Sequence, residues 1–428
     1  MSPFRAVVHW LRALPLVRYF EQFRPNARLF LLSTVISGIT LSGFQLFFNI
    51  YLKARGFDLD FIGLLNALPS GAALVVGVPM GLLSDRIGPR RAMLIGLSVA
   101  TLAAWGLIAS ESPSLMVVMA AVMGMANSLY YLSMAPFMMK ASGEKERTLL
   151  FSLNFGLTTL SGALGNLVAG QLPAWFAAGL GVGAESAPAY QAVLIASIFG
   201  GGLSLLPVWL IREVRWPGPR REAPLGLQDL RNLARPSVLR MALPNIIIGF
   251  GAATLIPYLA LFFKGRFPIS DGELGVLYSL GAITTGLATV VGPRLAQGLG
   301  GKVRAVVFTQ GASIVFLLAV GFAPAFWLSG LAFLIRGALM NMSNPLYSAF
   351  AMERTPERER AAVNSVMQLM WEVGWTVGPY LSGVVQARYG FAPLFVSTAV
   401  LYSLAIGLTW AFFHDAEARA PEAAPDAA

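Results

Sequence analysis

The 428-residue chain lacks cysteine and is poor in charged residues and in histidine. Without cysteine it can form neither a disulfide framework nor a thiolate metal site. Only 12% of the residues are charged, against about 25% in a usual soluble domain, whereas 56% are hydrophobic. The two histidines, His9 and His414, fall in the predicted terminal tails. The composition therefore predicts no metal, no cofactor, and an apolar solvent around much of the chain.

Acidic residues are outnumbered by basic ones, which gives a net charge of +10. The basic residues fall in short clusters between apolar runs, as is typical of loops at an anionic membrane face, and this argues against a nucleic-acid partner. Residues 1–28 contain five Arg but no uninterrupted apolar core, so we expect no cleavable signal peptide. Apolar residues at helical spacing predict a basic amphipathic segment on the membrane surface; a disordered basic tail is the alternative.

Long hydrophobic runs are abundant. A helix needs about 20 apolar residues to cross a bilayer. Twelve such runs can be marked: 29–51, 61–83, 92–110, 115–139, 148–172, 189–211, 238–263, 273–296, 304–322, 326–352, 361–386 and 391–413. The sequence therefore predicts an all-α membrane protein of twelve transmembrane helices.

The distribution of basic residues predicts the orientation. With the N-terminus in the cytoplasm, 25 of the 31 Lys and Arg residues fall in the tails and even-numbered loops. Five fall on the opposite side and one, Arg336, lies within a span. The positive-inside rule therefore predicts cytoplasmic N- and C-termini, and we expect a multi-pass protein of the bacterial cytoplasmic (inner) membrane.

The two halves of the chain repeat at a shift of 212–213 residues. Leu83 and Gly88 match Leu295 and Gly300, and residues 144–147 match residues 357–360. Because each half has six spans, both halves begin on the same side and the repeat is parallel. We expect bundles at 29–211 and 238–413, a cytoplasmic linker at 212–237 and a disordered cytoplasmic tail at 414–428.

The segment 81–91 reads GLLSDRIGPRR and resembles the signature loop of the major facilitator superfamily, G-x-L-[small]-D-[R/K]-x-G-[R/K]-[R/K]. It departs from that pattern at Pro89. A second element, Glu353-x6-Arg360, resembles the cytoplasmic E-x6-R element of sugar-porter-type members, although its counterpart in the first half has Lys140 in place of Glu. The resemblance implies the two-bundle fold of this superfamily and transport by alternating access.

The same resemblance implies a cytoplasmic gate that is held by charged groups when that side is shut. The carboxylate of Asp85 can face the positive N-terminus of the eleventh span. Simple anchoring at the cytoplasmic face is the alternative for Arg90 and Arg91. The candidate gate residues are Asp85, Arg86, Gly88, Arg90, Arg91, Arg147, Glu353 and Arg360.

Two ionisable residues lie deep within predicted spans, Arg336 in span ten and Glu372 in span eleven. Such groups are costly in a membrane and by default mark a functional site. We expect the two to lie close together and to form the coupling pair, with a static buried ion pair as the alternative.

Polar residues also recur at i, i+4 spacing on several spans, which suits a shared wet cavity. Hydrogen bonding between helices is the alternative for each residue singly. The candidate substrate-binding residues are Gln45, Asn49, Asn127, Tyr131, Asn154, Asn245, Tyr258, Arg336, Asn344, Tyr347, Gln368, Glu372 and Trp375.

These features together favour a transporter over an enzyme or a channel. The spans contain no His, Cys or paired carboxylates, and the chain has no ATP-binding G-x4-G-K-[ST] loop. We predict a monomeric secondary transporter, surrounded by membrane lipid, for a small amphipathic organic molecule, with proton-coupled efflux through Glu372 as the first hypothesis. Uptake or facilitated diffusion of an organic anion or a sugar-like solute is the second, and a membrane-embedded enzyme or a channel is the third.

Overall fold

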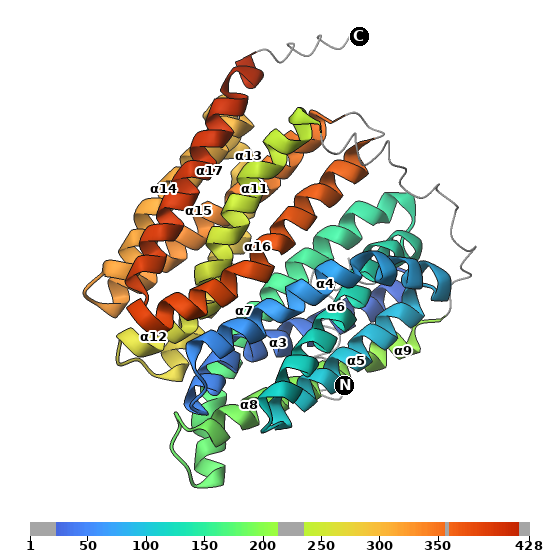
Figure 1. Cartoon of the computed structure of the whole chain (residues 1–428). Coiled ribbons are helices and arrows are strands. Elements are labelled where there is room, and N and C mark those ends of the chain that lie inside the picture. Colours follow the sequence, from blue (N-terminus) through green and yellow to red (C-terminus); the bar gives the residue numbers. More distant parts are fainter. Residues whose placement is uncertain (1–22, 213–234, 356–358, 419–428) are drawn as a thin grey trace, which may run out of the picture.

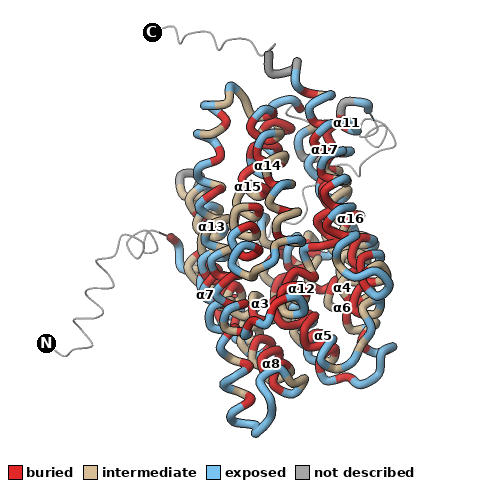
Figure 2. Tube along the Cα trace, turned by 90° about the vertical axis from the view of Figure 1, so that its left-hand side faces the viewer, coloured by how far each residue is buried: buried red, intermediate tan, exposed pale blue. Residues whose placement is uncertain are grey.

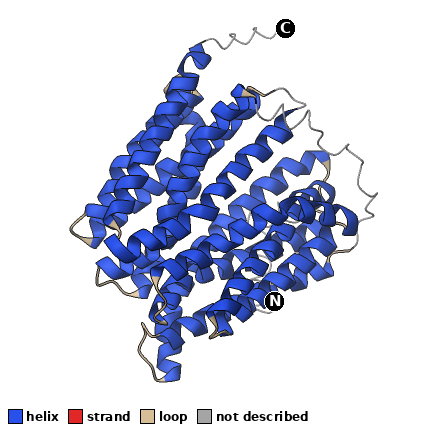
Figure 3. Ribbon diagram, in the orientation of Figure 1, coloured by secondary structure: helices blue, strands red, loops and turns tan. Residues whose placement is uncertain are grey.

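Helices account for almost all of the structure, a computed structural model that describes residues 23–212, 235–355 and 359–418 (Figure 3). No strand occurs within these ranges. Most of the predicted amphipathic segment 1–28 and most of the linker 212–237 lie outside the described residues.

The first half of the chain supplies seven helices to the structure. They are α3 (Pro25–Ala54), α4 (Leu59–Ile87), α5 (Pro89–Ala109), α6 (Pro113–Ala141), α7 (Glu144–Leu180), α8 (Ala187–Leu203) and α9 (Leu205–Leu210). Pro occupies the first turn of α3, α5, α6 and α8, where its missing N–H removes no hydrogen bond. The single residue Ser204 separates α8 from α9, and together these two cover the sixth predicted span.

The second half supplies the remaining elements. They are α11 (Pro236–Leu255), η1 (Ile256–Tyr258), α12 (Leu259–Arg266), α13 (Asp271–Gly298), α14 (Lys302–Phe322), α15 (Phe326–Glu353), α16 (Arg360–Tyr389) and α17 (Ala392–Ala418). The predicted span 238–263 is thus interrupted by the short 3-10 turn η1 at Pro257. A capping box of Ser270 and Glu273 fixes the start of α13.

The predicted tail 414–428 begins too early. Helix α17 continues to Ala418, and the His414 ring stacks on Trp410 one turn before it. Ala and Glu, which follow His414, are good helix formers and extend the helix beyond its apolar part.

Within the described ranges, ten helical segments are long and apolar enough to cross a membrane. Helices α15 and α16 are not among them, although they are 28 and 30 residues long. These two carry Arg336 and Glu372. The helices with the least apolar character are therefore the ones that hold the intramembrane charges.

The halves meet along two helix pairs, α4 with α16 and α7 with α13. At Gly63 a Cβ atom would lie 2.7 Å from the Pro379 carbonyl oxygen, and at Gly170 it would lie 2.8 Å from the Cα atom of Gly275. Only a residue without a side chain permits such close approach of two backbones. We call this end of the molecule the sealed end.

The other end, where α4, α6 and α9 finish and α11 and α16 begin, is called the linker end. Gly81 lies 18 residues, or about five turns, beyond Gly63 and so on the same face of α4. A Cβ atom there would meet nothing within 4 Å. Helices α4 and α16 lie side by side at the sealed end and separate toward the linker end, at the right of Figure 1. The structure is therefore closed at one end and splayed at the other.

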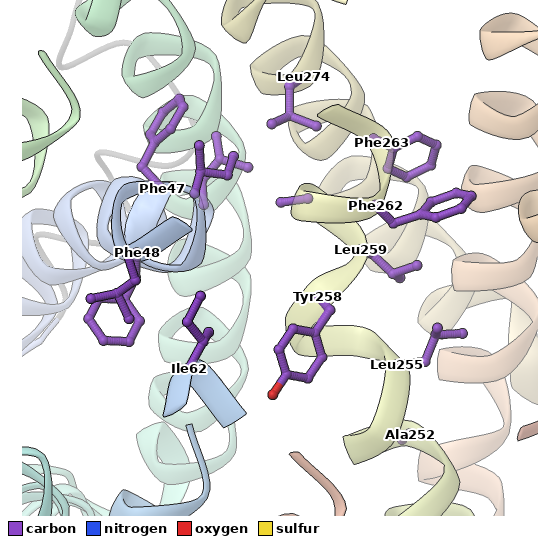
Figure 4. Packing of buried hydrophobic residues seen from close by; sticks show 14 of the residues in the cluster. Phe47, Phe48, Ile62, Ala252, Leu255, Tyr258, Leu259, Phe262, Phe263 and Leu274 are labelled. Atoms are coloured by element: carbon purple, nitrogen blue, oxygen red, sulfur yellow. The ribbon is translucent and has the colours of Figure 1, made fainter. Parts of the chain in front are cut away.

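Buried residues concentrate along the helix faces that pack inside the bundles (Figure 2). The largest cluster joins α3 to the segment η1–α12, with Phe47 and Phe48 on one side and Tyr258, Phe262 and Phe263 on the other (Figure 4). This apolar mass lies near the sealed end and holds the two halves together there.

Candidate functional site

A cavity of about 340 Å³ lies between the two halves, and we call it the central cavity. It is lined from both halves, by α3, α4, α6 and α7 on one side and by η1, α12, α13 and α16 on the other. Of the predicted substrate-binding residues, Gln45, Asn49 and Trp375 line it. Phe44, Phe48, Asn66 and Tyr278 also line it, and the sequence did not single them out.

Asn49 forms a polar bridge across this cavity's wall. Its amide nitrogen donates to the Pro257 carbonyl at 2.7 Å, and its amide oxygen accepts from the Asn66 side chain at 2.8 Å. The break at η1 turns the chain of the second half so that Pro257 faces the first half. The bridge satisfies a buried amide and joins the halves at the floor of the central cavity.

A second cavity, of about 200 Å³, lies within the second half, and we call it the C-half cavity. Of the predicted substrate-binding residues, Asn245, Asn344, Tyr347 and Gln368 line it. Gln310, Asn364 and Thr409 contribute further polar groups. Amides and hydroxyls therefore dominate its polar lining.

Glu372 lies on α16 between the residues that line the two cavities. Gln368 and Trp371 line the C-half cavity and Trp375 lines the central one. The Gln368 amide donates to the Glu372 carboxylate at 3.3 Å, and the rings of Trp371 and Trp375 lie 6.3 Å apart. Within the described residues the buried indole nitrogen of Trp375 has no hydrogen-bond partner. A carboxylate flanked by two indoles suits a cationic or polarised organic ligand.

The predicted pairing of Arg336 with Glu372 is not present. Arg336 is only 5% exposed and donates to the Tyr402 hydroxyl on α17 at 3.0 Å. In the described part of the chain it makes no ion pair with Glu372. Arg336 lies about 15 Å along α15 from the sealed end, whereas Glu372 lies about 25 Å along α16 from that end. In addition, α15 packs mainly on α13 and α14, and α16 on α4 and α11.

Four more predicted substrate-binding residues line neither of these cavities. Tyr258 is buried and donates to the Pro379 carbonyl at 2.7 Å, and Asn154 accepts from the Thr34 hydroxyl at 2.9 Å. Asn127 and Tyr131 lie on α6 but line neither cavity. Tyr258 and Asn154 thus form hydrogen bonds between helices, which the sequence analysis gave as the alternative to a cavity position.

The predicted gate residues gather at the linker end. Gly88 has φ of +87° and forms the turn between α4 and α5, which explains the need for glycine there. Arg90 donates to the Trp209 carbonyl at 2.6 Å. Asp85 and Arg86 lie in the last turn of α4, Arg91 in the first turn of α5 and Arg147 in the first turn of α7.

The predicted gate residues Glu353 and Arg360 have different partners. Glu353 forms an ion pair with Lys302 at the start of α14. Arg360 instead donates to the backbone carbonyls of Met352 and Thr355, at 3.0 and 3.2 Å. The Glu353 side chain thus joins the end of α15 to the start of α14, whereas the Arg360 side chain joins the start of α16 to the end of α15.

A buried charge cluster at the sealed end was missed by the sequence analysis. Lys264 lies 3.0 Å from Asp271 and 2.6 Å from Glu185. The Tyr190 hydroxyl donates to the Asp271 carboxylate, 3.2 Å from each oxygen. Glu185 and Tyr190 belong to the first half and Lys264 and Asp271 to the second, so the cluster ties the halves together. The sequence feature that could have pointed to this cluster is the helix-capping sequence at Ser270, because it places Asp271 at the start of a helix.

Comparisons with known proteins agree with this architecture. The family model for the Major Facilitator Superfamily matches residues 30–255 and 241–428. An uncharacterized MFS-type transporter, YhhS of Escherichia coli, is 25% identical over 387 residues and covers 87% of each chain. A multi-drug resistance efflux pump PmrA homolog of Lactococcus lactis is 30% identical over 176 residues, which are 39% of this chain and 42% of that protein.

Solved structures show the same fold. The nucleoside transporter NupG, as its D323A mutant, superposes with a TM-score of 0.71 at 13% identity, covering 91% of this chain and 99% of that one. A bacterial homolog of the human lysosomal transporter Spinster, in an inward-facing and unoccupied conformation, gives 0.68 at 16% identity, covering 94% and 96%. The chain is thus a multi-pass integral membrane protein of transporter rather than enzyme type, and it belongs to the major facilitator superfamily.

Proposed function

We propose that this protein is a secondary transporter that exports a small amphipathic organic molecule, neutral or cationic, by alternating access. The proposal rests on the central cavity, because residues of both halves line it and it lies between the two halves. A relative named as a multi-drug resistance efflux pump supports the export direction.

The distribution of basic loops and the closure of one end also indicate the orientation of the protein in the membrane and its conformational state. We place the linker end in the cytoplasm, since the basic loops gather there. The structure is then open toward the cytoplasm and closed toward the outside. Rocking of the halves about the central cavity exposes it to each side in turn.

The charges around the cavities favour a ligand that is not anionic. Among the described residues that line the two cavities there is no Lys or Arg, and Arg336 is engaged with Tyr402. Glu372 follows Trp371, which lines the C-half cavity, and lies one turn from Trp375, which lines the central one. A positive or neutral ligand with an apolar body matches these lining residues. The hypothesis that Arg336 binds an organic anion is therefore not supported.

Glu372 is also the proposed proton carrier. A carboxylate inside a membrane protein must be neutralised or paired with a cation. In an exchange of a proton for a cationic ligand, the proton neutralises the carboxylate in one state and the ligand pairs with it in the other. In the described part of the chain its side chain accepts from Gln368, which is a neutral partner.

The test is flux in proteoliposomes with an organic cation panel, with and without a pH gradient. Glu372→Gln is expected to abolish gradient-driven accumulation and to keep downhill exchange. Glu111→Gln, which removes an exposed carboxylate between α5 and α6 at the sealed end, is the matched control and should keep gradient dependence. Unchanged gradient dependence in Glu372→Gln would leave Glu372 a structural residue.

A second candidate function is facilitated diffusion of a hydroxyl-rich neutral solute. The C-half cavity favours it, because its amides and hydroxyls offer both donors and acceptors. The same flux assay separates the two, since such a solute would equilibrate without regard to the pH gradient in both the wild type and Glu372→Gln.

A further inference from the structure

A third cavity, of about 450 Å³, lies at the linker end of the first half, away from the proposed transport route. We call it the basic cavity. Arg24, Lys140 and Arg212, from three different helix ends, line it together with Pro25, Asn26, Leu29, Ala141 and Leu210. Among these described lining residues there is no acid. We propose that the basic cavity binds the headgroup of an anionic phospholipid.

Hydrogen bonds between helix ends hold the lining residues of the basic cavity in place. The Asn26 amide donates to the Arg212 carbonyl and accepts from the Arg212 backbone N–H, both at 3.1 Å. This reciprocal pair fixes the end of α9 against the start of α3 and so positions Arg212. The first turn of α3 contains no acidic residue, so the positive end of that helix adds to the field of the side chains.

The internal repeat shows why positive charge accumulates on this side. Glu353 in the second half corresponds to Lys140 in the first, and Lys302 corresponds to Arg90. In the second half these positions form an ion pair. In the first half both positions are basic, and Arg90 donates to the Trp209 carbonyl instead. The first half thus has a cation where the second has a carboxylate, and it has a cavity beside that cation.

The walls select a lipid over a small free anion. Leu29, Ala141 and Leu210 form an apolar flank, and Leu210 and its neighbour Trp209 are 56% and 65% exposed on the helix surface. Guanidinium groups bind phosphate in a bidentate manner, while the apolar flank accommodates the start of an acyl chain. Basic pockets between transmembrane helices on the cytoplasmic side hold anionic headgroups in this way.

The experiment is native mass spectrometry of the full-length protein in detergent, with phosphatidylglycerol, cardiolipin or phosphatidylcholine added. The wild type is expected to retain the two anionic lipids and not phosphatidylcholine. The triple variant Arg24→Gln/Lys140→Gln/Arg212→Gln should bind the anionic lipids about a hundredfold more weakly. The triple variant Lys53→Gln/Arg266→Gln/Arg388→Gln loses the same charge from exposed positions at the sealed end and should bind as the wild type does.

A single variant tests the proposal even if the triple variant misfolds. Lys140→Glu introduces the carboxylate found at the equivalent position of the second half, and it should weaken anionic-lipid binding about thirtyfold while the melting temperature stays near that of the wild type. Three results would overturn the proposal: wild-type lipid retention in both basic-cavity variants, equal retention of phosphatidylcholine, or full displacement of the lipid by millimolar inorganic phosphate, which would make this a free-phosphate site. The transport proposal is untouched by any of them.

Discussion

The two ends of the molecule use the same kinds of charged residue in different surroundings. At the sealed end, the side chains of Lys264 and Asp271 are 9% and 6% exposed. At the linker end, Lys302 and Glu353 are 33% and 61% exposed. Exposed pairs contribute about 0–1 kcal/mol, whereas removal of one partner from a buried pair costs several times more. The sealed end is therefore the more sensitive to loss of a charge.

The ends also differ in which parts of the molecule their charges join. The sealed-end cluster crosses between the halves through Tyr190 and Glu185, whereas the Lys302–Glu353 pair stays within the second half. Closure at the sealed end thus includes contacts that a rocking motion must break. The following changes are ordered from the largest expected effect to the smallest.

Lys264→Met tests the buried cluster. It leaves the Asp271 carboxylate buried without its cation, so we expect a loss of stability of about 3–5 kcal/mol. Thermal unfolding of the purified protein measures it. The double variant Lys264→Met/Asp271→Asn should recover much of the loss, and Glu185→Gln, whose side chain is 68% exposed, should cost about 0–1 kcal/mol. Equal losses in Lys264→Met and Glu185→Gln would show that burial does not distinguish this cluster.

Gly170→Ala tests the close approach of α7 and α13. The added Cβ atom would meet the Asp271 carbonyl and the Gly275 Cα atom at 2.8 Å, so the helices must move apart, at a cost of about 1–3 kcal/mol. We expect the sealed end to open more often. Because the chain has no cysteine, a single Gln171→Cys change reports its accessibility to maleimide without background.

Gly156→Ala is the matched control for this prediction. It lies on the same helix, and a Cβ atom there meets nothing within 4 Å. Its labelling rate should equal that of the parent. Identical rates in Gly170→Ala and Gly156→Ala would mean that the glycine crossing does not set the closure of the sealed end.

Asp85→Asn tests the linker end. Loss of a charge–dipole interaction with the N-terminus of α16 is worth about 0.3–2 kcal/mol. We expect weaker closure on this side and slower turnover with unchanged expression, measured as flux per reconstituted protein. Wild-type flux would show that Asp85 serves only to anchor the loop.

Much of the fold and part of the candidate site were readable from the sequence. The apolar runs predict the helices because a span must be long and apolar, and the loop at 81–91 carries the family resemblance. Polar stripes predicted lining residues such as Asn49, Asn245 and Gln368, since i, i+4 spacing places residues on one face of a helix. Spacing along one helix does not say which neighbour that face meets. This is why Tyr258 and Asn154 proved to be interhelical contacts rather than cavity residues.

What the sequence by itself determined is the set of helices, their repeat and the scarcity of intramembrane charge, because each depends on local composition. Only the tertiary structure decided which charges meet. Arg336 and Glu372 seemed natural partners in the sequence, yet their depths and the packing of α15 and α16 keep them apart, and Arg336 bonds to Tyr402 instead. Lys264 and Glu185 lie 79 residues apart in the chain and meet at 2.6 Å. Charge pairing depends on distance in space, which only the packing of the helices sets.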